Sequence, residues 1–166
     1  MKLVIFACLL FCIGCSKKKP VVDDSIDPWN SRYSVEGSLS DITEPRITWP
    51  GTYEYSLERV SGTQVKMVSK DLTTVGHLIS HGGSLSFYGN FGLLINFDPV
   101  TNKITSITNF YGQPSTSGRI AVLDPSGVNS WDPARKKMQI KHWMDETGIS
   151  GHRTSFSETW TYLGPL

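Results

Sequence analysis

The sequence predicts an all-β domain, built as a single antiparallel barrel or sandwich of about eight or nine strands. Apolar and polar residues alternate with period two from residue 31 onward, which is typical of half-buried strands. The chain has 15 glycines and 9 prolines, many in turn-forming groups, and no run of helix-forming residues. Short links make neighbouring strands antiparallel. A lipocalin-like barrel is favoured over a sandwich, because closure removes edge strands without covering helices.

The first 14 residues have the pattern of a secretory signal peptide. Lys2 precedes an unbroken apolar run from Leu3 to Ile13, and polar residues follow Cys15 at once. A membrane-spanning helix needs roughly 20 residues, so we expect this shorter segment to be removed. Residues 15–30 are rich in lysine and aspartate and predict a flexible tether. The β domain is then expected to span residues 31–166.

The motif Cys12-Ile13-Gly14-Cys15 resembles the lipobox of bacterial lipoproteins. In that family a cysteine receives a diacylglyceryl group and becomes the new N-terminus, and Gly14 supplies the small residue before the cut. Cys12 departs from the pattern, since leucine is usual there. The resemblance implies that Cys15 is lipidated and that the protein is anchored to a membrane of the cell envelope, namely the outer membrane. The alternative is an ordinary cleaved signal peptide with incidental cysteines.

Alternation and turn residues define the strands of the first half of the domain. Residues 33–39 and 53–58 are two expected strands, and Ser61-Gly62 turns the chain into a third around residues 65–67. The glycine-rich interval 72–92 is expected to hold one or two short strands, because glycine in strands often marks bulges or close backbone approach.

The second half of the domain begins with a strand that is expected to be buried on both faces, 92–97, where Leu93, Leu94, Ile95 and Phe97 break the alternation. Three further strands are expected: a returning strand at 103–111, a short strand at 119–123 after a loop, and a strand around 138–143.

Two turns share one pattern. Phe97-Asp98-Pro99 and Trp131-Asp132-Pro133 each place an aromatic residue before Asp-Pro, and polar residues and a strand follow. Proline fixes φ at the first turn position, and aspartate accepts hydrogen bonds from the backbone beyond it. The repetition predicts the same hairpin turn at both places.

The last strand, 153–162, shows the clearest alternation. Phe156, Trp160 and Tyr162 share one face, and serine and threonine dominate the other. Glu158 is the exception, because a carboxylate stands on the apolar face. An ion pair with Arg119 or Arg153, or a position at a barrel mouth, is expected more strongly than a catalytic role for Glu158.

Composition excludes several classes of function. The net charge of +1 leaves no electrostatic case for nucleic-acid binding. The chain has three cysteines, and only Cys15 remains after cleavage, so no disulfide and no cysteine metal site are expected. No serine lies in a Gly-x-Ser-x-Gly motif. We therefore expect no enzyme activity, no catalytic residue and no cofactor.

Histidines are few and scattered along the sequence. His77 and His81 would share one face of a strand, while His142 and His152 lie elsewhere. Metal sites need three or four convergent ligands, and no short His–Glu spacing provides them. No metal site is expected.

Four aromatic residues are the candidate ligand contacts. Trp49 and Trp131 fall in loops, Tyr88 lies in a glycine-rich segment, and Tyr111 leads into a loop. Aromatic faces with nearby amides and carboxylates can bind sugars. The alternative is that these amphipathic rings cap the ends of the core.

The segments Phe97 to Gly112, Leu123 to Asn129 and Glu158 to Leu163 resemble a group of uncharacterised C-terminal β domains in surface lipoproteins of the Bacteroidota, which commonly occur beside glycan-import systems. The resemblance implies an accessory outer-membrane role. The leading hypothesis is a non-enzymatic binding module for a glycan or for a partner protein of a nutrient-uptake assembly. The alternatives are a carrier of a small apolar ligand and a hydrolase that uses Glu158.

Overall fold

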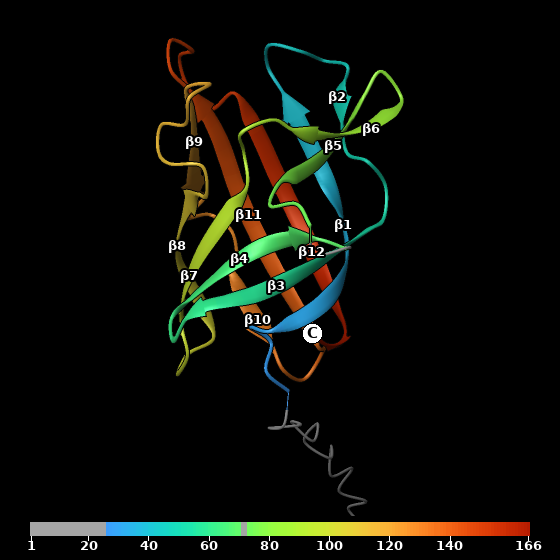
Figure 1. The fold of residues 1–166 in the computed structure, drawn as a ribbon, viewed down its shortest axis with the longest axis vertical. Helices are drawn as coiled ribbons and strands as arrows, with labels where there is room; N and C mark the ends of the chain where they lie inside the picture. Colours follow the sequence, from blue (N-terminus) through green and yellow to red (C-terminus); the bar gives the residue numbers. More distant parts are fainter. Residues whose placement is uncertain (1–25, 71–72) are drawn as a thin grey trace, which may run out of the picture.

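Twelve β-strands form the regular structure of residues 26–70 and 73–166, the part of the chain that the computed structural model describes (Figure 1). They are β1 (Ser31–Asp41), β2 (Ile47–Thr48), β3 (Tyr53–Ser61), β4 (Gln64–Ser69), β5 (His77–His81), β6 (Ser84–Tyr88), β7 (Leu93–Asp98), β8 (Lys103–Asn109), β9 (Arg119–Leu123), β10 (Ser130–Asp132), β11 (Lys137–Glu146) and β12 (Thr154–Pro165). Within these residues, no helix has the length and hydropathy needed to cross a bilayer.

Eight of the strands close into an antiparallel barrel, which confirms the predicted fold class. The sheet order is β10-β8-β7-β4-β3-β1-β12-β11-β9, and β10 also pairs with β11. This last pairing closes the ring and leaves β9 as an additional strand on β11. The pairing that closes the barrel at β10 is short. Ser130 pairs with Lys103 of β8 on one side, and residues 130–132 pair with β11 on the other.

The two Asp-Pro turns have the same geometry, as their sequences predict. The Oδ1 atom of Asp98 accepts backbone hydrogen bonds from the second and third residues after it, and Asp132 does the same. Each turn ends on a residue with positive φ, Asn102 at 57° and Lys136 at 53°. The turns join β7 to β8 and β10 to β11.

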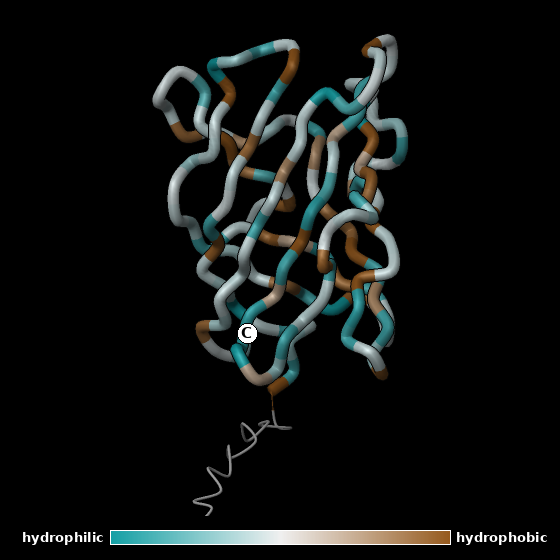
Figure 2. The backbone as a smooth tube through the Cα atoms, turned by 180° about the vertical axis from the view of Figure 1, so that it is seen from behind, coloured by the Kyte–Doolittle hydropathy of each residue, from teal (hydrophilic) through white to brown (hydrophobic). Residues whose placement is uncertain are grey.

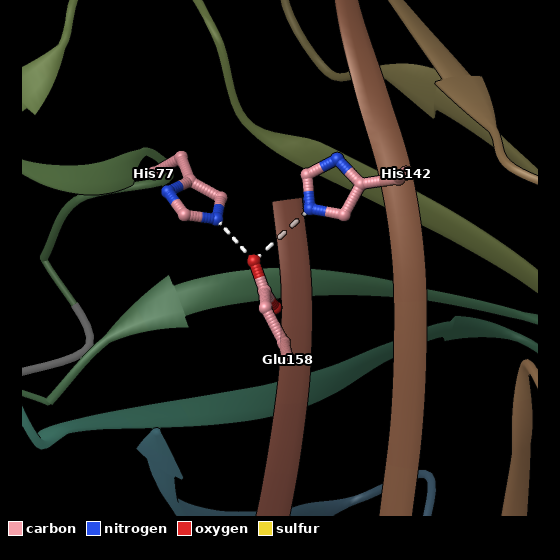
Figure 3. Close-up of side chains that lie close together, drawn as sticks. All are labelled: His77, His142 and Glu158. Atoms are coloured by element: carbon pink, nitrogen blue, oxygen red, sulfur yellow. Dashed lines mark hydrogen bonds and ion pairs between the residues drawn. The ribbon is translucent and has the colours of Figure 1, made fainter. Parts of the chain in front are cut away.

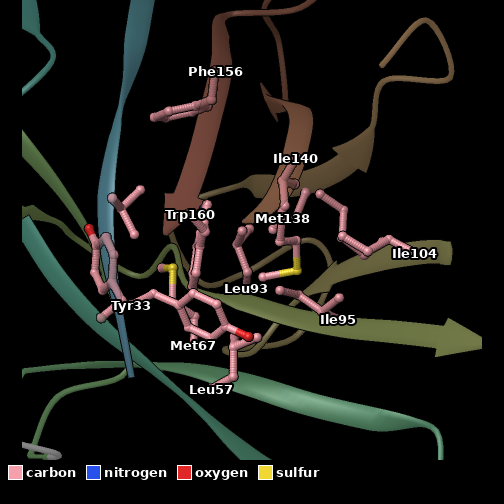
Figure 4. Close-up of a cluster of buried hydrophobic side chains, with 14 of the residues drawn as sticks. Tyr33, Leu57, Met67, Leu93, Ile95, Ile104, Met138, Ile140, Phe156 and Trp160 are labelled. Carbon is pink, nitrogen blue, oxygen red and sulfur yellow. The ribbon is translucent and has the colours of Figure 1, made fainter. Parts of the chain in front are cut away.

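Large side chains fill the barrel interior (Figure 4). An eight-stranded barrel is just wide enough for side chains to fill its interior. Hydrophobic and hydrophilic segments are interspersed along the backbone (Figure 2), and burial alternates from residue to residue in β7 and through most of β11. The largest wholly buried side chains are Trp160, Tyr33, Tyr55, Phe91, Phe156, Leu57, Met67, Leu78, Leu93, Ile95, Met138 and Ile140.

A second, three-stranded sheet in the order β2-β5-β6 lies at the end of the barrel away from the C-terminus (Figure 1). Its strand β5 begins in the core: His77, Leu78 and Ile79 are at most 4% exposed. Two hydrogen bonds hold this segment. The His77 backbone nitrogen donates to the Phe91 carbonyl at 2.9 Å, and that of Leu78 donates to the Tyr55 hydroxyl at 2.6 Å.

The sequence pattern missed two strands and misjudged one. The two-residue β2 and three-residue β10 are too short to show alternation. Strand β7 was expected to be buried on both faces, but Leu94 is only half-buried while Leu93 and Ile95 are wholly buried. Its faces therefore differ, as in the other barrel strands.

Residues 26–30 were assigned to the tether, yet they pack against the barrel. Trp29 is 3% exposed and stacks on Phe97 with ring centroids 4.0 Å apart. The Tyr33 hydroxyl donates to the Pro28 carbonyl at 2.5 Å, and the Leu166 backbone nitrogen donates to Asn30 at 3.2 Å. The described chain thus begins beside its C-terminus.

Cys15 lies outside the described residues, so its lipidation stays a prediction. A palmitate analogue supplied to growing cells should label the wild-type protein and not a Cys15→Ser variant. An unlabelled wild-type protein would contradict the lipobox assignment.

Candidate functional site

Glu158 lies inside the barrel, on the apolar face of β12 where the sequence places it. Its side chain is wholly buried. Two histidines lie beside it: His142 on the adjacent strand β11, and His77 at the start of β5 in the small sheet (Figure 3). Both rings are wholly buried. We call these three residues the His-Glu cluster.

Three donors converge on the Glu158 carboxylate. The Nε2 atoms of His77 and His142 lie 2.5 and 3.0 Å from its Oε1 atom (Figure 3). The indole nitrogen of Trp160 donates to the other oxygen, Oε2, at 2.7 Å. A carboxylate buried away from water needs such partners, because an unpaired buried charge is strongly destabilising.

The hydrogen-bond network fixes the protons of the two rings. The Leu78 carbonyl can only accept, so Nδ1 of His77, 2.9 Å away, carries a proton. A further proton lies between His77 Nε2 and the carboxylate. In His142, Nε2 donates to Glu158, while Nδ1 is buried without a partner. That arrangement fits a neutral His142 ring whose Nδ1 is a bare lone pair.

Electrostatics agree with this assignment. Burial lowers the pKa of His142 below its ordinary value, because a charged ring would lose its hydration. Burial alone would raise the pKa of Glu158, but the electrostatic interaction with His77 and the hydrogen bonds from both histidines outweigh it and hold that pKa well below the ordinary value. The carboxylate is therefore the anionic centre of the cluster.

Aromatic rings enclose the cluster. The Phe156 ring stacks on His142 with centroids 4.5 Å apart and lies 4.3 Å from the His77 ring. Phe91 contacts both histidines, and Trp49 meets His77 edge-on. These rings separate the carboxylate from solvent.

The expectation that Glu158 pairs with Arg119 or Arg153 is wrong. Glu158 pairs with histidines, while Arg153 forms ion pairs with Glu146 and Asp41. The guanidinium of Arg119 lies over the Tyr88 ring, 4.4 Å from its centroid. Both arginines lie outside the cluster, with their guanidinium groups near the Tyr88 ring.

No family model matches this chain, and neither curated proteins nor solved structures gave a match.

The four candidate aromatic residues do not form one platform. Trp131 lies on β10 and is 5% exposed, with its ring packed edge-on against Tyr33 and Tyr162. Tyr88 is the last residue of β6 in the small sheet, and Tyr111 follows the end of β8. Trp49 is half-buried beside His77, and its indole nitrogen has no partner.

Tyr88 and Tyr111 have different surroundings. Tyr88 is 3% exposed, and its hydroxyl donates to Asp41 at 2.8 Å. Burial, and then the nearby Asp41 carboxylate, raise the pKa of Tyr88 to about 12. Tyr111 is 42% exposed, and its hydroxyl donates to the Val75 carbonyl. Tyr111 is thus the one of the four whose ring is open to solvent.

The other two histidines are exposed at the surface. His152 stacks on Trp143 with ring centroids 3.6 Å apart and lies 2.8 Å from Asp145. His81 pairs with Ile47 in the small sheet.

A groove of about 430 Å³ runs along the outer wall of the barrel, over β10, β11 and β12. We call it the outer groove. The Trp131 segment forms part of its lining, together with Val128 and Pro133. A smaller hollow of about 210 Å³ shares Val128 and two polar side chains with it, which extends the concave surface. The polar residues that line the outer groove are Ser130, Asp132, Arg135, Lys137, Gln139 and Thr159.

Sequence reasoning identified Glu158 but missed its histidine partners. One signal was present for His142, which shares its face of β11 with the buried Met138 and Ile140. No comparable signal existed for His77, which lies 81 positions from Glu158 on a strand of the other sheet.

Proposed function

We propose that this chain is a non-enzymatic lipoprotein of the bacterial envelope, and that its barrel domain binds a glycan in the outer groove. The observation that carries the proposal is the groove itself. It is a hollow on the barrel wall lined by six hydrogen-bonding side chains together with Val128, Trp131 and Pro133. Sugar hydroxyls need donors and acceptors close together, and this lining offers carboxylate, amide, hydroxyl and cationic groups.

The surface beside the groove is also rich in hydroxyls. Thr159 lines the groove, and its neighbours on the outer faces of β12 and β1 pair across the strands, Ser157 with Ser38 and Ser155 with Ser40. Such a polar, weakly charged wall suits a long neutral ligand better than a strongly charged one. Partner proteins of an uptake assembly are the second class of occupant, and the binding test distinguishes them.

The two alternatives have weaker support. Wholly buried side chains such as Met67, Ile95 and Trp160 fill the barrel where an apolar cargo would sit. Glu158 accepts from three buried donors and is shut off from solvent, which argues against a hydrolase that uses it. The outer groove meets solvent, as a binding surface must.

The test is a glycan array followed by isothermal titration with the full chain in detergent. A Lys137→Ala/Gln139→Ala variant should bind a glycan at least about tenfold more weakly, a loss equivalent to about 1.4 kcal/mol. Lys66→Ala/Gln64→Ala is the matched control, because these residues have the same spacing on β4 and lie outside the groove.

Three outcomes would overturn the proposal. One is an array on which the wild-type protein binds no glycan. Another is equal weakening by the groove and control variants. The third is capture of a protein from the uptake assembly that the groove variant abolishes while glycans fail to compete, which would assign the groove to a protein partner.

A further inference from the structure

We infer that the His-Glu cluster is a binding site for one divalent transition-metal ion, with zinc as the ion to test. The ligand atoms of His77, His142 and Glu158 all lie within 4.8 Å of one another and are buried. Two imidazoles and one carboxylate are a known three-residue zinc set. This inference departs from the expectation drawn from sequence spacing, and it concerns a different place from the outer groove.

The protons of the cluster explain why it can take a metal ion. Nδ1 of His77 donates to the Leu78 carbonyl, so the lone pair of the neutral ring lies on Nε2. That lone pair points at a carboxylate oxygen 2.5 Å away. Two electron-rich atoms this close need a positive charge between them. A proton supplies it in the hydrogen-bonded state, and a metal ion can replace that proton.

Hydrogen bonds to residues outside the cluster already orient two of the three ligands, His77 and Glu158. Metal-binding histidines usually donate their other ring nitrogen to a carbonyl or carboxylate, as His77 does to Leu78. Trp160 donates to Oε2 of Glu158, which leaves Oε1 directed at both histidines. Both histidine nitrogens are therefore directed at the same carboxylate oxygen.

Metal binding requires the three ligand atoms to move relative to one another. Two ligands 2.0–2.1 Å from a tetrahedral zinc ion are about 3.3 Å apart. The Oε1 atom of Glu158 lies closer to both histidine nitrogens, at 2.5 and 3.0 Å. His77 lies on β5 of the small sheet while His142 and Glu158 lie on barrel strands, so metal binding requires β5 to move relative to Glu158 without separating the two histidine nitrogens further. The ion would then tie the two sheets together.

When a metal ion replaces the proton between His77 and Glu158, every proton of the cluster can be accounted for. The metal-free cluster holds three: one on His77 Nδ1, one between His77 and Glu158, and one on His142 Nε2. With metal bound, His77 keeps its Nδ1 proton, and the His142 proton moves from Nε2 to Nδ1. The proton between His77 and Glu158 leaves, so one proton is released for each ion bound.

The experiment uses the full chain in detergent, treated with a chelator and dialysed. Zinc chloride is titrated calorimetrically near pH 7 in two buffers of different ionisation enthalpy. The expected result is about one zinc ion per chain, release of about one proton, and a higher melting temperature. A wild-type protein that binds no zinc, or that binds it without releasing a proton, would overturn the inference.

Zinc binding by variants of the cluster and of the surface histidines shows where the ion binds. His142→Phe preserves the stacking on Phe156, and Glu158→Gln preserves the side-chain shape. Each should weaken zinc binding at least about 100-fold. His81→Ala/His152→Ala removes the exposed histidines and should leave binding unchanged. The opposite pattern would place the zinc at the surface and refute the inference. Should the cluster variants fail to fold, the His81→Ala/His152→Ala variant still decides, because loss of zinc binding in it would refute the inference.

Discussion

Replacing Glu158 with alanine is expected to lower the free energy of unfolding by about 3–5 kcal/mol, the usual cost of removing one partner of a buried ion pair. His77, His142 and Trp160 would each lose their acceptor inside a dry core. A cavity would add to the loss. Guanidinium denaturation of metal-free protein measures the effect. Glu36→Ala, an exposed carboxylate on β1, is the control and should change stability by less than about 0.5 kcal/mol.

Removing the whole His-Glu cluster should affect stability differently from removing Glu158 alone. A triple variant, His77→Leu/His142→Phe/Glu158→Leu, removes every polar partner together and fills the space with apolar atoms. Replacing a whole buried ionic cluster is often neutral or stabilising, so the triple variant should be more stable than Glu158→Ala alone. A triple variant that is less stable than the single one would mean that the cluster contributes net stability.

Replacing Asp41 with alanine is expected to cost about 3 kcal/mol, because its side chain is wholly buried and anchors the end of β1. One carboxylate oxygen accepts from the Tyr88 and Thr154 hydroxyls at 2.8 and 2.6 Å. The other accepts from the backbone and hydroxyl of Thr43 at 2.9 Å. Arg153 lies 3.4 Å away. Glu58→Ala breaks a partly exposed ion pair with Lys66 and should cost at most about 1 kcal/mol.

The Asp41 effect should depend on pH in one direction. Burial opposes ionisation of Asp41, but hydrogen bonds from Thr154, Thr43 and Tyr88 hold its pKa well below the ordinary value of about 3.9. A lowered folded-state pKa contributes stability above the unfolded-state value, which is lost as pH falls toward the folded-state value. The stability difference between wild type and Asp41→Ala should therefore be constant from pH 7 to 5 and should shrink below about pH 4. A difference that grows in acid would contradict this role.

The barrel could be predicted because its determinants are local. Alternation in β1, β3 and β12 marks the face of each residue, and the Asp-Pro turns at Asp98 and Asp132 specify hairpins through backbone hydrogen bonds within the turn. These signals require no knowledge of distant contacts. The resemblance to surface-lipoprotein domains was an expectation about function, and it remains one.

The cluster could be predicted only in part, because strand register is a property of the folded sheet. The sequence marks Glu158 as a carboxylate on an apolar face. It does not show that Phe156 lies opposite His142, or that β5 enters the core so that His77 reaches β12. The outer groove was missed for a similar reason. Its lining joins β10, β11 and β12 with Val128 from a loop, and no single stretch of sequence contains that surface.

The convergence of three donors on the Glu158 carboxylate is tested most directly by long-range nitrogen–proton NMR of the imidazole rings, recorded on metal-free protein near pH 7. His142 should be a neutral ring with its proton on Nε2 and a bare Nδ1, and His77 should carry a proton on Nδ1. A His142 ring protonated on both nitrogens, or on Nδ1 alone, would contradict the arrangement.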